Sequence, residues 1–527
     1  MLDTLLRGGT VIDGTGRAAF AADVAIENGK IAAVEQLSHA QARRTVDCTG
    51  MTVTPGFIDI HRHADGAAFR PGFGEWELCQ GLTTIVNGNC GLSAAPFGPD
   101  NEAAIRAYLQ PITGDLPPRL DSRSLAGYFR SLPALPLNVG MLVGAGTLRA
   151  DAAGYQLTEL ADGHFAAIHC QMEQALSDGA LGVSLGLGYA PECFYSTADL
   201  IRALQPVAGT DIPVTVHMRQ EGGGVVESVR EMIAVARALD CPVHISHLKA
   251  MGRDNWGKKI PQVLTLLEQA QNEGLRVDCD VYPYTAGSTQ LLHILPPDYL
   301  TGGMEAVVER LRDKNVRREL AARIESGVGF DDIAKLAGWD GIYLTSLHCP
   351  EDHPYQGHNL MEIAALMGQD PLSSCCELLA REHGQITMID FMASEEDICA
   401  ILRSPLSCVI SDATYPTEGQ LHPRVCGNVT HLLEHFVREK KALSWEQAVH
   451  KLTGRPAQVL GLTGKGRLKA GCDADVCMFA PEALHERATY TEPQQTSQGM
   501  SLVLVAGEIA LENGKPTGIC AGRAVRR

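Results

Sequence analysis

Apolar, strand-like runs alternate with helical stretches through the long middle of this chain, from about residue 55 to about residue 464. Strands that alternate with helices at this spacing are typical of a parallel sheet joined by helical crossovers. We therefore expect an α/β fold, and the number of segments suits a (β/α)8 TIM-like barrel. The expected strands span residues 83–86, 137–143, 181–184, 213–217, 242–247, 277–282 and 409–411, and the expected helices include residues 163–177, 224–239, 260–273 and 444–451.

The two ends of the chain are rich in short β-like runs and turn signals. Asn28-Gly29 lies between apolar alternating residues, and Asn513-Gly514 repeats this pattern near the other end. Asn-Gly in such a setting is typical of a two-residue hairpin. The ends predict one small β-sandwich domain formed by residues 1–54 and 465–527, with the barrel at residues 55–464. Between about residues 296 and 340 a charged, helical pattern predicts an insertion that could act as a lid.

Charge and composition limit the partners. The 527 residues include 44 basic and 62 acidic side chains, a formal charge of −18, which repels nucleic acid and anionic membrane surfaces. A few cations in a pocket could still bind a small anion. The 16 cysteines form no CxxC motif, no long apolar run is present, and the first residues do not resemble an export signal. We expect a cytoplasmic protein with reduced thiols, and composition indicates no oligomeric state.

A His-x-His motif follows the first apolar run of the middle region. His61 and His63 point to the same side of an extended segment because side chains alternate along a strand. Two imidazoles at a strand end could be half of a metal site, or a pair of core histidines. Later strand ends have to supply the other ligands if the first interpretation is right.

Four further residues supply such groups. His217 and His247 end successive strand-like runs, Cys90 lies between glycines directly after another, and Asp412 ends a late one. Each has an ordinary alternative, since a lone cysteine is usually a packing residue and an aspartate after a strand often caps a helix or turn. His244 faces away from His247 and serves as the comparison for a structural histidine. Jointly, nitrogen, sulfur and carboxylate ligands at barrel strand ends favour a Zn²⁺ site.

Several longer motifs resemble those of a known family. They are residues 55–63, Gly88-Asn89-Cys90-Gly91, Gly186-Leu187-Gly188-Tyr189-Ala190-Pro191, His217-Met218-Arg219, residues 244–249, Asn255-Trp256-Gly257-Lys258, residues 282–289 and Ser411-Asp412. They resemble the N-acyl-D-amino-acid deacylase (D-aminoacylase) family of the amidohydrolase superfamily, over nearly the whole chain. One difference is Gly188, where many relatives are expected to carry a larger residue, which leaves the substrate preference open.

The chain contains no lysine between His63 and His217. Many members of the superfamily bridge two metals with a carboxylated lysine from this interval. That bridge is chemically unavailable here, and the Cys90 thiolate can hold Zn²⁺ without modification.

The resemblance implies roles for the candidate residues. Cys90, His217 and His247 would hold one tightly bound zinc, while His61 and His63 would line a second, weaker position. Asp412 would act as general base, taking the proton of the attacking water and delivering it to the leaving amine. The residues expected to bind substrate are Lys249, Tyr282, Ser288, Arg424 and Tyr189. Without the resemblance, Lys249 and Arg424 could equally be solvated surface charges.

The predicted function is zinc-dependent hydrolysis of N-acyl-D-amino acids, small molecules that yield a carboxylate and a free D-amino acid. The D-configuration is implied by the resemblance alone. A β-aspartyl-type dipeptidase and a cyclic-amide hydrolase are alternatives on the same scaffold, and the missing lysine counts against both. A non-catalytic metal-binding protein is the alternative from another class.

Overall fold

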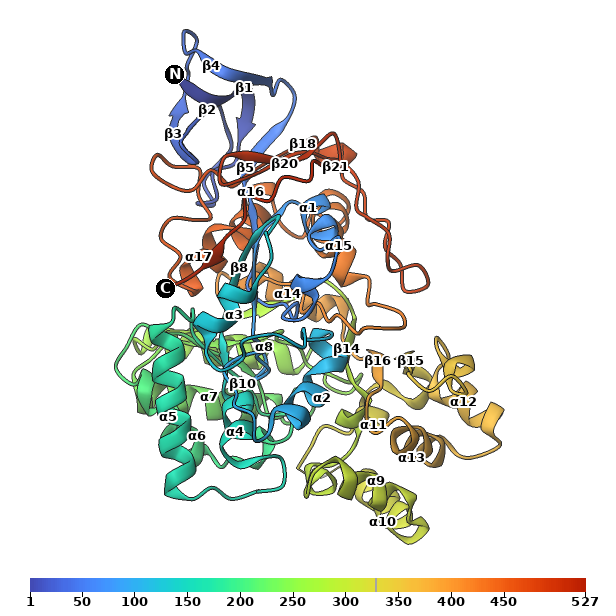
Figure 1. The fold of residues 1–527 in the computed structure, drawn as a ribbon. Helices are drawn as coiled ribbons and strands as arrows, with labels where there is room; N and C mark the ends of the chain where they lie inside the picture. The colour runs from blue at the N-terminus through green and yellow to red at the C-terminus, as the bar shows by residue number, and fades with distance from the viewer. Residues whose placement is uncertain (328) are drawn as a thin grey trace.

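The middle of the molecule is a barrel of parallel strands (Figure 1). The computed structural model describes residues 1–327 and 329–527. Around the barrel the strands are β6 (Phe57–Asp59), β7 (Leu82–Asn87), β8 (Asn138–Met141) continued by β9 (Val143–Gly144), β10 (Val183–Gly186), β11 (Val214–His217), β12 (Val243–Ile245), β13 (Val277–Val281) and β17 (Ser407–Val409). A parallel bridge between Arg62 and Ala413 joins the two ends of this series. If β8 and β9 are counted as one interrupted strand, the described residues form the eight-stranded barrel that the alternation predicts.

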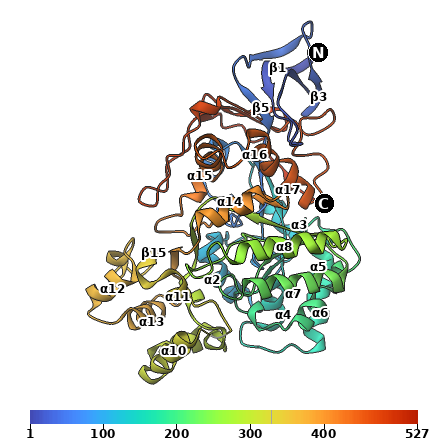
Figure 2. The ribbon, with the colours of Figure 1, turned by 180° about the vertical axis from the view of Figure 1, so that it is seen from behind.

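Helices cover the outside of the barrel. The four predicted helices correspond within one residue at each end to α5 (Asp162–Ser177), α7 (Val225–Leu239), α8 (Lys259–Asn272) and α16 (Trp445–Leu452). Helix α7 shows why these segments are helical, since its buried residues Val225, Val229, Met232 and Ala236 recur every three or four positions. From behind, α7 and α8 lie side by side along the barrel (Figure 2). The other helices outside the insert are α1 (Glu75–Cys79), α2 (Glu102–Thr113), α3 (Leu125–Ser131), α4 (Ala145–Ala153), α6 (Thr197–Ala203), α14 (Glu395–Arg403), α15 (Arg424–His431) and α17 (Gly454–Val459).

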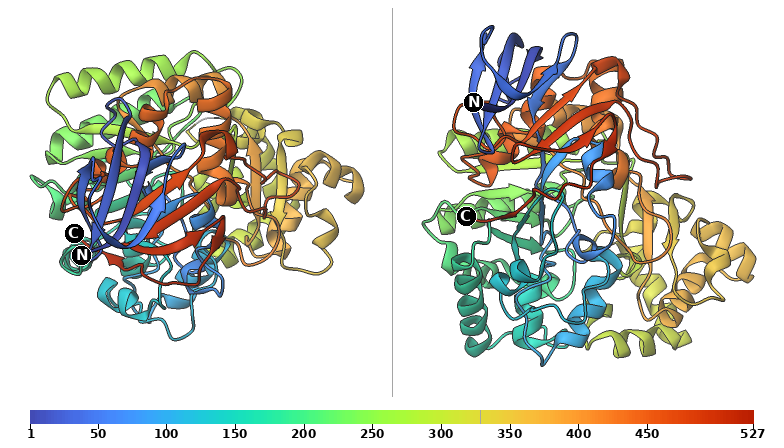
Figure 3. Two further views of the ribbon diagram at one scale, coloured as in Figure 1. Left: turned by 90° about the horizontal axis from the view of Figure 1, so that it is seen from above. Right: turned by 45° about the horizontal axis from the view of Figure 1, so that its top comes forward.

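Both ends of the chain contribute to one nine-stranded sheet (Figure 3). Its strands are β1 (Leu2–Val11), β2 (Phe20–Glu27), β3 (Lys30–Glu35), β4 (Ala42–Asp47), β5 (Thr52–Pro55), β18 (Val476–Phe479), β19 (Met500–Val505), β20 (Glu508–Glu512) and β21 (Lys515–Pro516). The two ends meet where β5 pairs antiparallel with β18. Both predicted hairpins are confirmed, and Asn28 and Asn513 each have a φ of 52°, as their tight turns require. The short strand β22 (Ala524–Val525) then pairs with barrel strand β8.

A separately packed insert follows β13. Strands β14 (Ala286–Gln290), β15 (Ile342–Ser346) and β16 (Thr387–Phe391) form a small antiparallel sheet. Helices α9 (Met304–Arg312), α10 (Lys314–Ser326), α11 (Ile333–Ala337), α12 (Leu360–Met367) and α13 (Pro371–Arg381) accompany it beside the barrel (Figure 1). Its apolar core extends from Leu291 to Met392, beyond the expected insertion at 296–340. No strand is expected from the sequence between residues 282 and 409, where β14, β15 and β16 lie.

None of the helices formed by the described residues is long and apolar enough to cross a membrane.

The side chain of Arg62, between the two histidines of the motif, points away from them into a buried network. It contacts Asp59 Oδ2 at 3.2 Å and Glu77 Oε1 at 3.0 Å, and it donates to the Val425 carbonyl at 3.1 Å. Arg62 Nε also donates to the Tyr415 hydroxyl at 3.1 Å. Because the guanidinium is fully buried, these partners are all that balance its charge.

We expect Arg62→Met to lower the free energy of unfolding by about 3–5 kcal/mol, since it leaves Asp59 and Glu77 buried without their cation. Thermal and urea denaturation would measure the loss. Arg230→Met on α7 is the control, because Arg230 is 57% exposed and its replacement should cost less than about 1 kcal/mol. Equal stability of the two variants would contradict the importance of this network.

Candidate metal centre

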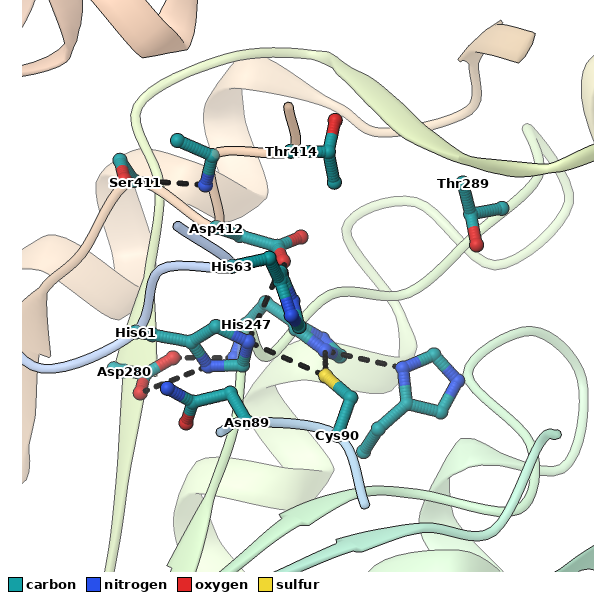
Figure 4. A network of polar contacts seen from close by, with 12 residues as sticks. His61, His63, Asn89, Cys90, His247, Asp280, Thr289, Ser411, Asp412 and Thr414 are labelled. Carbon is teal, nitrogen blue, oxygen red and sulfur yellow. Dashed lines mark hydrogen bonds and ion pairs between the residues drawn. The ribbon is translucent and has the colours of Figure 1, made fainter. Parts of the chain in front are cut away.

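The six predicted metal-site and catalytic residues meet at the carboxyl ends of the barrel strands. His61 and His63 follow β6, Cys90 follows β7, His217 ends β11, His247 follows β12 and Asp412 follows β17. Figure 4 shows the side chains of His61, His63, Cys90, His247 and Asp412 converging. All six are at most 9% exposed. The sequence therefore predicts correctly which residues come together.

Four of these residues form the tightest group. Ligand atoms of His61, Cys90, His247 and Asp412 all lie within 4.8 Å of one another. Cys90 Sγ is 3.2 Å from His61 Nε2 and 3.5 Å from His247 Nε2, and His61 Nε2 is 3.3 Å from Asp412 Oδ1. His63 Nε2 lies 3.2 Å from the same carboxylate oxygen.

A second group adjoins the first through His247. His217 Nδ1 lies 3.1 Å from His247 Nε2, and Glu221 completes this group. Cys90 Sγ and His217 Nδ1 thus both contact the same atom of His247, its Nε2. The sequence prediction placed Cys90, His217 and His247 on one metal; His247 is the residue that both groups share.

These contacts fit a metal ion. Two ligands that are ~2.0–2.3 Å from a tetrahedral metal stand about 3.3–3.8 Å apart. The ligand-atom separations of 3.1–3.5 Å among His61, Cys90, His217, His247 and Asp412 are close to that range. A thiol, imidazoles and a carboxylate with lone pairs directed at one another are a donor set that a cation stabilises.

The backbone at three of these positions is left-handed. Cys90 has a φ of 53°, His247 of 37° and Asp412 of 52°, values that residues other than glycine rarely adopt. The turns correct two strand predictions. Strand β12 ends at Ile245 and β17 at Val409, before the histidine and the aspartate that we expected to end them.

Because β12 ends at Ile245 and the chain turns at His247, Lys249 lies beyond the end of the strand. The ammonium of Lys249 nevertheless lies next to the metal-site residues, 2.6 Å from Glu221 Oε2 and 2.9 Å from His247 Nδ1. Burial alone would raise the pKa of Glu221, but Lys249 together with His217 and His247 holds that pKa below its ordinary value. Glu221 Oε1 lies 3.0 Å from His247 Nδ1, so one buried carboxylate contacts both a metal-ligand candidate and the ammonium.

Asp412 is paired with Arg424. The guanidinium Nη1 lies 3.0 Å from Asp412 Oδ2. Burial would raise the pKa of Asp412, yet Arg424 and the two motif histidines hold it well below its usual range. Arg424 is fully buried and is not among the residues that line the pocket, and its expected contact with a substrate carboxylate stays a prediction. The guanidinium instead keeps Asp412 ionised and in place.

The other predicted substrate residues line a cavity of about 590 Å³ above the metal-site residues. Lys249, Tyr282, Ser288 and Tyr189 all face it, together with Asp412. The Tyr189 hydroxyl contacts Thr289 Oγ1 at 2.9 Å, and the Tyr189 ring packs 4.5 Å from that of His217. The insert contributes Ile333, Asp390 and Met392 to the cavity wall.

Sequence reasoning missed Glu221 and Asp280. Glu221 lies four residues after His217 and just before three glycines, the one local signal of a special turn. Asp280 on β13 accepts the backbone N–H of His247, and its Oδ2 lies 2.8 Å from His244 Nε2. His244 is therefore held in a carboxylate pair outside the metal site, as expected for a structural histidine.

The position of the His217 ring explains why residue 188 has no side chain. A Cβ added there would lie 2.7 Å from His217 Nε2 and 2.9 Å from His293 Cε1, closer than such atoms approach. The absence of a side chain at Gly188 therefore lets the His217 ring lie where it contacts His247.

Gly188→Ala should displace the His217 ring and weaken metal binding. Overpacking of this kind costs about 1–3 kcal/mol, or about 5- to 150-fold in affinity. Competition with a chelator would measure the affinity. Gly163→Ala on α5 is the control, because an added Cβ there meets nothing within 4 Å. Unchanged metal affinity in Gly188→Ala would show that His217 is not a ligand.

A closed parallel barrel with histidine, cysteine and aspartate at its strand ends defines the class of metal-dependent barrel hydrolases. The amidohydrolase family model matches residues 44–511. N-acyl-D-glutamate deacylase of Alcaligenes xylosoxydans xylosoxydans is 35% identical over 530 residues, 100% of this chain and 97% of that protein. D-aminoacylase of the same organism is 33% identical over 527 residues, 100% and 98% of the two chains.

A solved structure agrees with these relatives. N-acyl-D-glutamate deacylase from Bordetella bronchiseptica, crystallised with zinc and a phosphonate mimic of the tetrahedral intermediate, has a TM-score of 0.82 and 31% identity, covering 100% of both chains. This chain belongs to the amidohydrolase family and, within it, to the D-aminoacylase family.

Proposed function

We propose that this protein is a zinc-dependent N-acyl-D-amino-acid deacylase. The observation that carries the proposal is one cavity that holds both halves of such a site: the cluster of histidine, cysteine and aspartate, and a lysine with hydroxyl groups suited to a carboxylate. The full-length relatives, which are deacylases of N-acyl-D-amino acids, support the same activity and the D-configuration.

The donor set favours zinc. A cysteine thiolate with imidazoles is the ligand combination that Zn²⁺ prefers over Mg²⁺ or Ca²⁺. We assign Cys90, His217 and His247 to the tight position, and His61 and His63, next to Asp412, to the weaker one. When bound, zinc supplies a Lewis acid for the amide carbonyl and lowers the pKa of water.

The side chains of the protein bind the substrate and transfer the proton. Lys249, Tyr282 and Ser288 bind the substrate carboxylate, and Tyr189 packs against the bound molecule. Asp412, ionised beside Arg424, accepts the proton of the attacking water and delivers it to the nitrogen of the leaving amine. Arg424 holds Asp412 in its ionised form, and its contact with the substrate carboxylate remains the prediction made from the sequence.

A panel of N-acetyl D- and L-amino acids tests the function. We expect the zinc-loaded protein to release acetate from the D-compounds with a kcat/KM at least about 100-fold above that for their L-enantiomers, a ratio within reach of pocket shape alone. Equal rates for both enantiomers would refute the stereochemistry, and cleavage of cyclic amides alone would refute the reaction.

Two substitutions separate metal binding from proton transfer. Cys90→Ala should lose most of the bound zinc, measured by metal analysis after dialysis. Asp412→Asn should keep the tightly bound zinc but lower kcat by about 10²- to 10⁴-fold, the usual contribution of a general base. Full zinc in the first variant, or normal turnover in the second, would remove that residue from its role.

A further inference from the structure

A second cavity, of about 820 Å³, lies beside the metal-site cavity. The two share Tyr108 and Gln290 as lining residues. Gln290 Nε2 donates to the Tyr108 carbonyl at 2.8 Å, so strand β14 and helix α2 meet at the boundary. A molecule bound at the metal-site residues would therefore need to extend only past these two side chains to enter the second cavity.

The walls of this second cavity are apolar on two facing elements. Helix α2 presents Ala104, Ala107 and Pro111, which lie on one helical face because they are three and four residues apart. The insert presents Leu300, Met304 and Val307 from α9 and the turn before it. Figure 1 shows α2 on the side of the barrel next to the insert. Small residues on one wall and large ones on the other leave room for a ligand.

Charge is distributed unevenly between the two cavities. No aspartate, glutamate, lysine or arginine is among the described residues that line the second cavity, although the polar side chains of Gln156, Gln385 and the exposed His383 are. In the metal-site cavity the described lining residues include Glu221, Asp390 and Asp412 but only one ammonium or guanidinium group, that of Lys249. One substrate carboxylate can therefore pair with Lys249, whereas neither cavity offers a second lysine or arginine among its described lining residues to pair with another carboxylate.

We infer that the cavity between α2 and α9 receives an uncharged, apolar arm of the substrate. The inference rests on the proposed function and narrows its substrates to N-acyl-D-amino acids with an apolar arm. Two parts of such a molecule have the required chemistry, the acyl chain and the amino-acid side chain. Each methylene buried there should raise kcat/KM about fourfold until the cavity is filled.

Two substrate series test this inference on the zinc-loaded protein. One extends the acyl group of N-acyl-D-alanine from acetyl to octanoyl; the other extends the side chain of N-acetyl-D-amino acids from alanine to norleucine, with D-aspartate and D-glutamate as charged members. We expect kcat/KM to rise about fourfold per added methylene in one of the two series, and that series identifies which part of the substrate enters the cavity. We expect N-acetyl-D-glutamate to be at least about 100-fold poorer than N-acetyl-D-norleucine.

Variants that fill the second cavity test whether the gain in kcat/KM arises there. Ala107→Trp should lower the ratio of kcat/KM between the longest and shortest members of the rising series at least tenfold, and Ala104→Phe provides a second such variant. Ala103→Trp, an exposed position of α2 outside the cavity lining, should leave this ratio unchanged.

The outcomes separate the inference from the proposed function. Three results would overturn the apolar-arm inference while leaving the deacylase activity intact. They are a kcat/KM that does not rise along either series, a preference for N-acetyl-D-glutamate over N-acetyl-D-norleucine, and an unchanged ratio of kcat/KM between the longest and shortest substrates in both cavity variants. Failure to cleave any N-acyl-D-amino acid would overturn the proposed function itself.

Discussion

The closure of the barrel between β17 and β6 is the contact on which the candidate site depends. Asp412 donates its N–H to the His61 carbonyl at 2.9 Å, and His63 donates its own to the Ala413 carbonyl at 2.9 Å. These two bonds place a late carboxylate against an early pair of imidazoles. Behind them, buried Arg62 pairs with Asp59, whose carboxylate also accepts from Ser411. Because the same two segments carry His61, His63 and Asp412 as well as the closing bonds, these three residues meet only when the barrel is closed.

His247 joins the metal-site residues to the substrate-binding residues. Its Nε2 faces Cys90 and His217, while its Nδ1 faces Glu221 and Lys249. A carboxylate behind a metal-ligating imidazole fixes the orientation of the ring and raises its basicity. Glu221 also neutralises the ammonium of Lys249, which stabilises this buried cation in the pocket. The net charge of the whole protein is −18, so the positive charge available to a substrate carboxylate is local. An incoming substrate carboxylate would therefore compete with Glu221 for Lys249.

The sequence predicts the barrel and the members of the site because both are encoded locally. Apolar runs that end in histidine, cysteine or aspartate mark strand ends, and parallel strands bring those ends together. Glu221 and Asp280 escape such reasoning, since carboxylates are common and their partners become neighbours only in the fold. The left-handed turns at Cys90, His247 and Asp412 are equally invisible, because residues other than glycine give no signal for them. The insert extends beyond the expected residues 296–340 because its small sheet pairs β14 with β16 and β16 with β15, which are far apart in the sequence and become neighbours only in the fold.

The architecture separates the chemistry of the site from the selection of its substrate. The metal-site residues lie at the ends of barrel strands, held by backbone pairing and by buried charge, where a small displacement disturbs several contacts at once. The apolar cavity lies between α2 and α9, and neither helix carries a residue of the metal site. Substitutions on these two helices can change the size of the cavity without moving His247 or Asp412. Selection of the substrate arm can therefore vary among proteins that share this barrel while the arrangement of donor atoms stays constant.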